Sequence, residues 1–408
     1  MSIQISPSAL NFSAMHDRMQ WYVDQNILPS CQTLVLSGTD VIDHKSFGPA
    51  SYENSVDAVA ELNENSIYRI YSNTKLITSI AAMMLFEEEK FALDDPLHTY
   101  IKDFANMQVL KPDAQLARDT EAVDSDISIR QIMSHSSGLS YAFVEPESLI
   151  DRTYAAAGIN PLMTQGKTLE GLCAELCQLP LAFQPGTNWR YSLGTDVLAR
   201  LIEIWSGQRF DEFLKQRIFS VLDMSDTDFY VPEDKLNRLT AMYAPNDLLD
   251  VMASGYALAD AGAATQSPGF LSGGGGLLST LSDYTSFVQM LINQGTWKGQ
   301  TIIKPETLEL MRSNQLAQNV GVNFPMWDMT GTTFGLGFAL KEQAAKGEPK
   351  SAIGEYHWGG LAGTHSWMNT SAGADGQGIS GICMTQVMPA FWHPFSHDFK
   401  RMVYEITA

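Results

Sequence analysis

The chain has 408 residues, of which 45% are hydrophobic and 18% are charged, a composition typical of a globular protein that buries a large core in one domain or two. The formal net charge of −20 argues against nucleic acid and an anionic membrane surface as partners, because both bind basic faces. No apolar run reaches membrane-spanning length, and the N-terminus lacks a basic segment followed by an apolar one. We therefore expect no secretory signal and a cytoplasmic location.

The first part of the chain predicts a surface helix followed by strands. Residues 10–26 have amphipathic helical spacing, and β-rich runs follow at Cys31–Ser37 and Val41–Phe47. A short β-rich run at 67–71 leads into residues 76–86, which are apolar almost all round, as in a helix buried in a core.

Ser72 and Lys75 open that buried helix. Residues three apart on the first helical turn lie on one face, and the helix N-terminus adds free N–H donors and partial positive charge. Burial lowers the pKa of an ammonium group by up to ~3–5 units, which leaves a free amine that can take a proton. The pair therefore predicts a serine nucleophile with an amine base. The alternative is an N-cap serine beside a solvated lysine.

The rest of the chain predicts helices in the middle and strands at the end. The acidic stretch 111–128 is expected to be an exposed loop, and the expected helices lie at 129–133, 169–178, 192–206, 279–294 and 395–407. The expected C-terminal strands lie at 334–340, 354–358, 365–369 and 378–388.

Strands at both ends of the sequence predict an α+β fold. The simplest architecture is an antiparallel sheet flanked by helices and built from residues 1–90 and 325–408, with a mostly helical lobe inserted at 91–324. The active site is then expected between the two lobes.

Acyl transfer on a serine needs further groups. The Gly-x-Ser-x-Gly motif of other serine esterases is absent. Tyr191, at a junction between a loop and a helix, is the best candidate to protonate a leaving oxygen, although ordinary packing is the alternative. An oxyanion hole needs two backbone donors, one from Ser72 N–H and one from a strand edge.

Several stretches, taken in order, resemble a known family. They are YSNTK (71–75), LDDPLHTYI (93–101), IRQIMSHSSGLSYAF (129–143), FQPGTNWRYSLGTDVLARLIE (183–203), SGGGGLLSTLSDYTSFVQMLINQG (272–295) and YHWGGLAGTHSW (356–367). The chain resembles the serine β-lactamases and penicillin-binding proteins, and most of all the family VIII carboxylesterases, which are related to class C β-lactamases. The resemblance implies a β-lactamase/transpeptidase-like fold, with Ser72 as nucleophile, Lys75 as its base partner and Tyr191 as the tyrosine of the second motif. It also places the second oxyanion donor at Leu361 N–H.

Two motifs differ from the β-lactamase pattern. The Tyr-x-Asn motif is Tyr191-Ser192-Leu193 here, and Trp358-Gly359-Gly360 stands in place of Lys-Thr-Gly. Leu193 cannot hydrogen-bond and Trp358 carries no charge, so we expect a neutral acyl group in an apolar pocket. Its expected lining is Tyr141, Phe143, Trp358, Gly359, Gly360 and Trp367, with core packing as the alternative for the aromatic residues.

The expected function is hydrolysis of short-chain carboxylic esters through an acyl-enzyme on Ser72. The alternatives are a β-lactamase or D-alanyl-D-alanine peptidase-like enzyme, an acyltransferase, and a non-catalytic binding module. The expected partner is a small ester, without cofactor or metal, and the sequence leaves open whether the chain forms a homo-oligomer. Three expectations concern histidines: His393 and His397 are not expected to bind metal, His135 is expected to be structural, and His357 and His365 are candidates to border the cleft. The cysteines are expected to be free thiols; they are Cys31, Cys173, Cys177 and Cys383.

Overall fold

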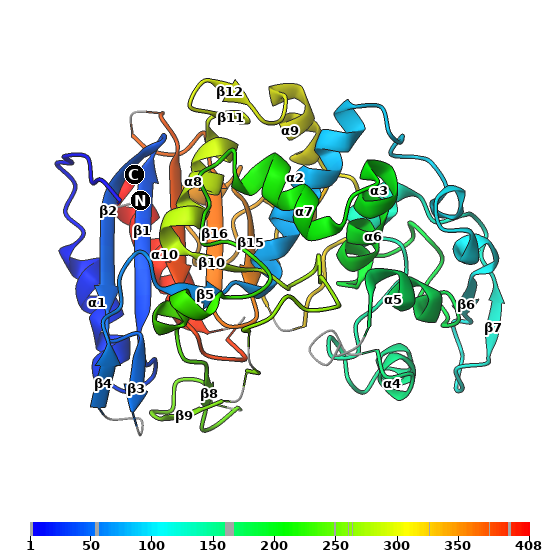
Figure 1. Ribbon diagram of the computed structural model, residues 1–408, viewed down its shortest axis with the longest axis horizontal. Coiled ribbons are helices and arrows are strands. Elements are labelled where there is room, and N and C mark those ends of the chain that lie inside the picture. The colour runs from blue at the N-terminus through cyan, green and yellow to red at the C-terminus, as the bar shows by residue number, and fades with distance from the viewer. Residues whose placement is uncertain are drawn as a thin grey trace.

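A seven-stranded antiparallel sheet extends from the left edge of the molecule in Figure 1, where β2 and β1 lie, towards its middle. The computed structural model describes residues 3–53, 57–159, 167–248, 250–259, 261–262, 264–325, 327–374, 376–390 and 393–408. The sheet order is β13-β14-β15-β16-β17-β1-β2, and every neighbouring pair is antiparallel. Its strands are β1 (Cys31–Ser37), β2 (Asp40–Phe47), β13 (Thr332–Phe334), β14 (Ala339–Lys341), β15 (Tyr356–Gly360), β16 (Thr364–Asn369) and β17 (Ile379–Met384). The predicted antiparallel sheet built from both chain ends is confirmed.

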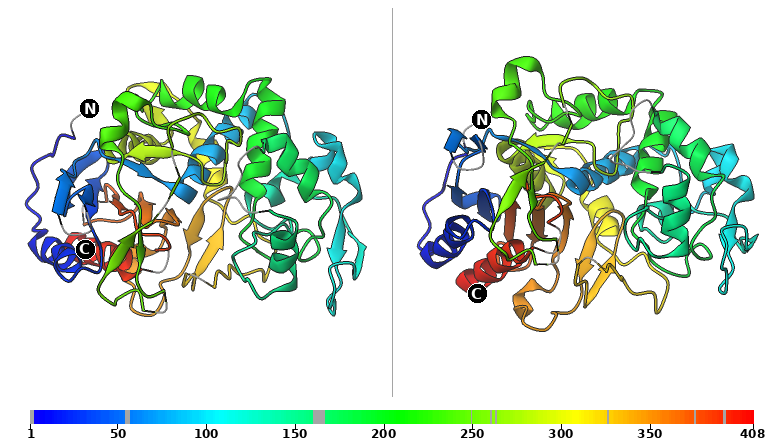
Figure 2. Two further views of the ribbon diagram at one scale, coloured as in Figure 1. Left: turned by 60° about the horizontal axis from the view of Figure 1, so that its bottom comes forward. Right: turned by 90° about the horizontal axis from the view of Figure 1, so that it is seen from below.

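Helices cover both faces of this sheet. Strand β1 alternates between the faces: Leu34 and Leu36 join the core that holds α2 (Thr74–Glu87) and α8 (Leu281–Ile292). Cys31 and Val35 pack instead with α1 (Ser13–Asp24) and α10 (Pro394–Thr407). Figure 2 shows α1 and α10 side by side on the same side of the sheet. Because both faces are covered, β1 is buried along almost its whole length.

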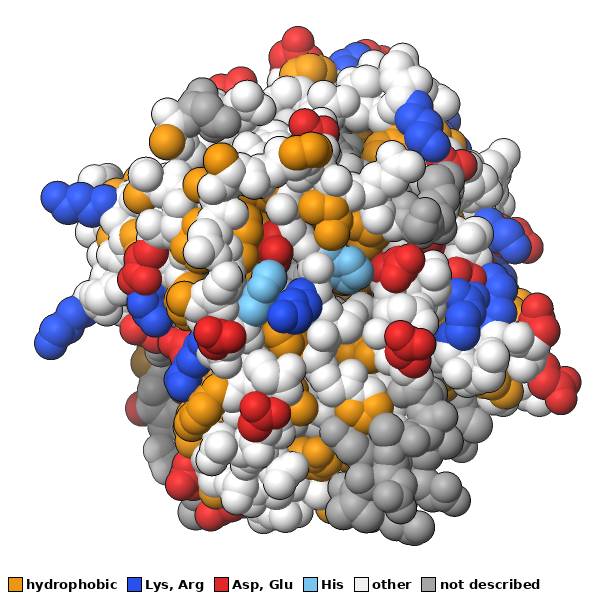
Figure 3. Space-filling model, turned by 90° about the vertical axis from the view of Figure 1, so that its left-hand side faces the viewer, with side chains coloured by type: hydrophobic (Ala, Val, Ile, Leu, Met, Phe, Trp, Pro, Cys, Tyr) orange, Lys and Arg blue, Asp and Glu red, His pale blue; other side chains and the backbone are white. Residues whose placement is uncertain are grey.

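The outer surface of α1 and α10 is polar. Arg18 of α1 forms an ion pair with Asp398 of α10, and Arg401 of α10 forms an ion pair with Glu405 one turn further along. Figure 3 shows the side of the molecule that lies at the left in Figure 1, where acidic and basic side chains are interspersed. The view gives no extended basic patch that would suit a polyanion.

The predicted buried helix is α2, and a short turn precedes it. Strand β5 (Ile67–Arg69) pairs with β10 (Leu278–Thr280) and ends two residues before the position expected from sequence. A single 3₁₀ turn at Tyr71–Asn73 then leads into α2, whose residues are buried from Thr74 to Leu85. Ser72 therefore lies in the turn that enters α2, at the start of the core helix.

The remaining elements gather mainly to one side of the sheet (Figure 1). The helices are α3 (Ile129–Met133), α4 (Leu149–Ala156), α5 (Leu169–Leu176), α6 (Gly194–Ser206), α7 (Phe210–Leu214) and α9 (Pro305–Met311), with shorter helical turns at Leu97–Thr99, Lys102–Asn106, Lys215–Phe219, Glu233–Arg238 and Lys350–Ala352. Small hairpins pair β3 (Ser51–Glu53) with β4 (Asp57–Ala60), β6 (Gln108–Leu110) with β7 (Thr120–Ala122), β8 (Tyr243–Pro245) with β9 (Tyr256–Leu258), and β11 (Thr296–Trp297) with β12 (Gln300–Thr301). Helix α8 packs on the sheet although it lies within 91–324, so the division at residues 90 and 325 stays a prediction.

Two local predictions were wrong in part. The stretch 111–128, expected to be a loop, contains β7, which pairs with β6. The single strand expected at 334–340 is the end of β13, a turn and the start of β14. The chain turns at Gly337, which has φ +94°, and a Cβ there would lie 2.1 Å from Ser79 Oγ of α2. The alternation of large and small residues at 334–340 had predicted one continuous strand. Gly337, which has no side chain, allows the turn to pack closely on α2.

Candidate active site

Strand β16 holds the turn that carries Ser72. Asn73 Nδ2 donates to the Thr364 carbonyl at 2.9 Å, and Asn73 Oδ1 accepts from Ser366 Oγ at 3.2 Å. Tyr71, immediately before the serine, has φ +43°, a left-handed conformation that is uncommon for a residue with a side chain. The Ser72 side chain is therefore fixed between α2 and the sheet, and the residue is 8% exposed.

Two of the predicted side chains, Lys75 and Tyr191, meet at this serine. The Tyr191 hydroxyl donates to Ser72 Oγ at 2.7 Å, and Lys75 Nζ lies 3.4 Å from the same oxygen. Lys75 Nζ also lies 3.0 Å from the Tyr141 hydroxyl and 2.6 Å from the Gly274 carbonyl. Lys75 and Tyr191 are almost completely buried, so these polar groups have little contact with bulk water.

Burial sets the charge of these groups. It lowers the pKa of Lys75 from the ordinary value of 10.5 to about 7, against the opposing field of the Asp196 carboxylate. Burial also raises the pKa values of the Tyr191 and Tyr141 phenols well above their usual range. At neutral pH both phenols are therefore protonated, while a large fraction of Lys75 is the free amine.

A neutral amine matches these contacts in number and kind. It has two N–H bonds and one lone pair. The Gly274 carbonyl and the Tyr141 oxygen accept the two N–H groups, which directs the lone pair of Lys75 towards Ser72 Oγ. Because Tyr191 donates to Ser72 Oγ, the serine hydroxyl proton is free to point at the amine.

Aromatic rings surround the phenol of Tyr191. Trp358 Nε1 donates to the Tyr191 oxygen at 3.3 Å, and the two ring centres are 5.2 Å apart. Phe324 packs on Tyr191 at 5.0 Å, and Phe143 packs on Tyr141 at 4.8 Å. Of the residues predicted to bind substrate, Tyr141 and Trp358 thus touch the catalytic candidates directly.

Trp367 does not join this group. It lies on the opposite face of the sheet, where its ring packs 4.8 Å from that of Tyr404 in α10. The register explains why this prediction was wrong. Trp358 of β15 pairs with Ser366 of β16, so both side chains point to the same face of the sheet and Trp367 points to the other.

The two predicted backbone donors lie where the end of β15 meets the turn that carries Ser72. A Cβ on Gly360 would lie 2.3 Å from the Ile70 carbonyl, so the end of this strand packs against the chain just before Ser72. In the described part of the chain, neither Ser72 N–H nor Leu361 N–H donates a hydrogen bond. Both groups have the free N–H that an oxyanion hole requires, and their role stays a prediction.

Sequence reasoning missed two partners of Lys75, the Gly274 carbonyl and the Asp196 carboxylate. The glycine run 273–276 lies in one of the stretches that carry the family resemblance, but no site residue was predicted in it. A Cβ on Gly274 would lie 2.6 Å from Asp196 Oδ2 and 2.8 Å from the Tyr141 hydroxyl. A signal was present in the sequence: Asp196 lies among the apolar positions Leu193 and Val197 of a buried helix face.

The histidines lie outside the contacts of Ser72. His135 Nδ1 is 3.1 Å from Ser192 Oγ, and its ring packs 5.1 Å from Tyr191. His357 and His365 pack against Trp327, and burial lowers the pKa of His365 to about 3. Within the described ranges, no group of three or more His, Cys, Asp or Glu side chains could hold a metal ion. The four cysteines are free.

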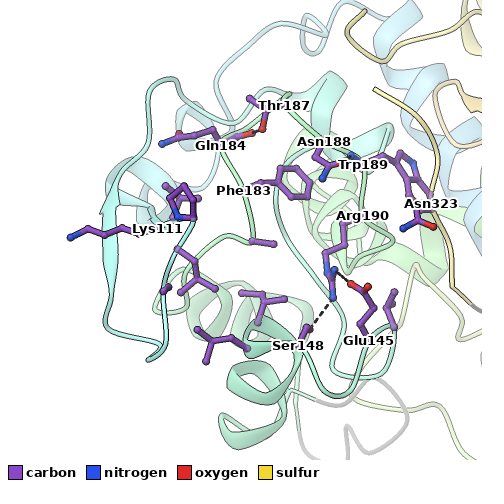
Figure 4. Close-up of a pocket in the computed structure, with 18 of the residues that line it drawn as sticks. Lys111, Glu145, Ser148, Phe183, Gln184, Thr187, Asn188, Trp189, Arg190 and Asn323 are labelled. Carbon is purple, nitrogen blue, oxygen red and sulfur yellow. Dashed lines mark hydrogen bonds and ion pairs between the residues drawn. The ribbon is translucent and has the colours of Figure 1, made fainter. Parts of the chain in front are cut away.

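A cavity of about 620 Å³ lies beside the loop that leads to Tyr191 (Figure 4). Arg190 lines it and forms an ion pair with Glu145 and a 3.2 Å hydrogen bond to Ser148. Tyr191 itself is not among the lining residues, so this space borders the site without containing the catalytic candidates. Among the described helices, none combines the length and apolar character needed to cross a membrane.

Comparison with known proteins places this geometry in a family. A model of the Beta-lactamase family matches residues 16–391. The Mycobacterium tuberculosis protein Rv1367c is 30% identical over 363 residues, covering 86% of this chain and 85% of that protein. Esterase EstB of Burkholderia gladioli is 27% identical over 386 residues, covering 90% of each chain. The solved structure of EstCE1, a hydrolase with promiscuous acyltransferase activity, has a TM-score of 0.78 at 22% identity and covers 96% of this chain and 98% of that one. The predicted fold is confirmed, and the chain belongs to the Beta-lactamase family, which has esterases among its members.

Proposed function

We propose that this protein is a family VIII-type carboxylesterase that hydrolyses short-chain esters through an acyl-enzyme on Ser72. The observation that carries the proposal is the position of Ser72 Oγ, 2.7 Å from the Tyr191 hydroxyl and 3.4 Å from Lys75 Nζ in a buried site. The similarity to Esterase EstB over 90% of the chain supports an esterase in particular.

In the proposed acylation, Ser72 Oγ bonds to the ester carbonyl carbon while its proton passes to Lys75 Nζ. The carbonyl oxygen becomes an oxyanion and accepts hydrogen bonds from Ser72 N–H and Leu361 N–H, each contributing about 2.7–4 kcal/mol in the transition state. The bond to the leaving oxygen then breaks, and that oxygen takes the proton of Tyr191. The proton held by Lys75 restores the phenol; Lys75 Nζ lies 4.6 Å from the centre of the Tyr191 ring.

Deacylation uses the same groups, with water as the nucleophile. Water gives a proton to Lys75 Nζ and attacks the acyl carbon. The bond to Ser72 Oγ then breaks, this oxygen takes the proton of Tyr191, the proton held by Lys75 restores the phenol, and the acid leaves. An alcohol in place of water would give a new ester, so acyl transfer uses the same intermediate. The hydrolase EstCE1, of the same fold, has promiscuous acyltransferase activity, and this makes transfer the second candidate.

The lining around the serine supports a neutral, small acyl group. Leu193 is completely buried and lies where a β-lactamase has a hydrogen-bonding asparagine. Trp358 presents an indole N–H to Tyr191 in place of the lysine charge that would hold a carboxylate. Phe143 packs on Tyr141 and Phe324 packs on Tyr191, and we expect these rings to limit the space for a long acyl chain.

The test is a series of p-nitrophenyl esters with acyl chains of increasing length, measured on wild type and Ser72→Ala. We expect the highest kcat/KM with short chains and a loss of at least roughly 10³-fold in the variant. Ser79→Ala, which removes another buried serine of α2, is the matched control and should retain activity. Full activity in Ser72→Ala would refute the proposal, a preference for long chains would refute the pocket argument alone, and faster cleavage of nitrocefin would favour a β-lactamase. Added alcohols that yield new esters would demonstrate transfer.

A further inference from the structure

We propose that Asp196 is the positioning residue of the Lys75 base: its carboxylate holds the Gly274 carbonyl against the Lys75 amine and supplies the negative charge that this amine faces. The inference rests on the proposed function, because that proposal makes Lys75 the base.

Hydrogen bonds connect Asp196 to Lys75 through the glycine run. Asp196 lies in the first turn of α6 and is completely buried. Its Oδ1 accepts from Ser272 Oγ at 2.6 Å and from Gly274 N–H at 3.1 Å. The carbonyl of the same glycine accepts from Lys75 Nζ at 2.6 Å. Gly274 is thus held by the carboxylate through its N–H and binds the base through its carbonyl.

The second carboxylate oxygen has no hydrogen-bond partner among the described residues, although it is buried. It lies on the same side of Gly274 as the Tyr141 hydroxyl, because a Cβ on this glycine would lie within 3 Å of both oxygens. A buried carboxylate oxygen without a partner is costly unless a cation offsets it. Burial raises the pKa of Asp196, and the field of Lys75 in its protonated form opposes that rise.

The other titratable groups around Lys75 are neutral at neutral pH. Burial raises the pKa values of Tyr141 and Tyr191, and it lowers the pKa of His135, on which Lys75 also acts. Among these neighbours, Asp196 is the carboxylate, and its field raises the pKa of Lys75 against the effect of burial. Its charge stabilises the ammonium form of Lys75, including the ammonium that forms when Ser72 attacks.

Asp196→Asn tests the charge while keeping the shape of the side chain and an oxygen that can accept from Gly274 N–H. Without the charge, the amine holds its proton less tightly, so the acid limb of the pH profile should move to lower pH by roughly one unit or more. The plateau should also fall, since the ammonium formed in the transition state loses its counter-charge. The readouts are ester hydrolysis and the rate at which a fluorophosphonate labels Ser72, each measured against pH.

Asp283→Asn is the matched control. Asp283 is also a buried carboxylate, and it likewise accepts from one backbone N–H, that of Asp226 at 2.7 Å, and one hydroxyl, that of Thr227 at 2.9 Å. This variant should be destabilised to a similar degree without any shift of the acid limb. A folded Asp196→Asn protein with the acid limb of wild type would overturn the proposal, because a merely structural role changes stability and leaves the pH profile in place.

If Asp196→Asn fails to fold, the effect of Lys75 on the proton affinity of Asp196 is measured instead. Coupling is reciprocal, so removal of the Lys75 charge should make Asp196 bind a proton more readily. Infrared difference spectra of ¹³C-aspartate-labelled Lys75→Met and wild type should then show an additional protonated carboxyl group in the variant at neutral pH. Its absence would overturn the proposal. This measurement needs no activity, so it separates failure of this inference from failure of the proposed function, which wild-type hydrolysis tests alone.

Discussion

Replacement of Lys75 by methionine should abolish activity and yet stabilise the fold, most strongly at low pH. Lys75 is 3% exposed, and its pKa of about 7 in the fold compares with 10.5 for an ordinary lysine. Between these two values the unfolded chain carries a proton that the folded protein does not, so the free energy of unfolding rises with pH. The cost of the buried lysine is therefore largest below pH 7 and disappears towards pH 10.5.

The size of this effect follows from the same shift. About 3.5 units at 1.4 kcal/mol each give a cost of about 5 kcal/mol at pH 6, and about 2 kcal/mol remain at pH 9. In Lys75→Met, loss of the hydrogen bond to the Gly274 carbonyl reduces the gain in unfolding free energy by about 1–3 kcal/mol at any pH. The stability difference between Lys75→Met and wild type should thus shrink by about 3 kcal/mol from pH 6 to pH 9.

Urea unfolding of both proteins at pH 6, 7.5 and 9, followed by circular dichroism, measures this difference. Lys102→Met removes the same charge from an exposed position, and its stability difference should stay constant over this range. A difference for Lys75→Met that does not change with pH would show that Lys75 keeps an ordinary proton affinity, and the argument for a free-amine base would fail.

Three further outcomes are expected. In wild type, kcat/KM for a short-chain ester should fall about tenfold per pH unit below the Lys75 pKa of about 7 and level off above it; a limb near pH 10 would exclude this base. Tyr191→Phe should lower kcat roughly 10²–10⁴-fold with little change in KM in steady-state assays, because the ring still packs while the proton donor is lost; unchanged kcat would assign the proton transfer elsewhere. Asn73→Ala should lower the free energy of unfolding by about 1–3 kcal/mol in urea titrations, because it leaves the Thr364 carbonyl and Ser366 hydroxyl without their partner; a neutral effect would show that β16 does not anchor the turn.

Local periodicity made much of the fold predictable. Strand β1 and helix α2 lie where alternation and an all-round apolar run predicted them. The turn at Gly337 could not be foreseen, because the reason for it is a side chain of α2 far away in the sequence, Ser79, which contacts it in the fold. The position of Trp367, by contrast, could have been deduced from strand alternation once the hairpin of β15 and β16 was placed.

The site divides in the same way. Ser72, Lys75 and Tyr191 could be predicted because short motifs carry them, and the structure brings their side chains together. Asp196 and Gly274 could not be assigned from local pattern, since their importance arises only where α6 and the glycine run meet α2. A carboxylate on an apolar helix face remains the type of signal by which such a residue can be suspected.

The order of the strands has a consequence for biosynthesis. Strand β1 leaves the ribosome long before its neighbour β17, so Leu34 faces its partner Ile382 only after the whole segment between them has been made. Until then, the apolar surface of β1 and of α2 has no sheet to cover it. The nascent polypeptide therefore exposes apolar segments until β17 has been made. During translation, aggregation and chaperone binding compete with folding for these segments.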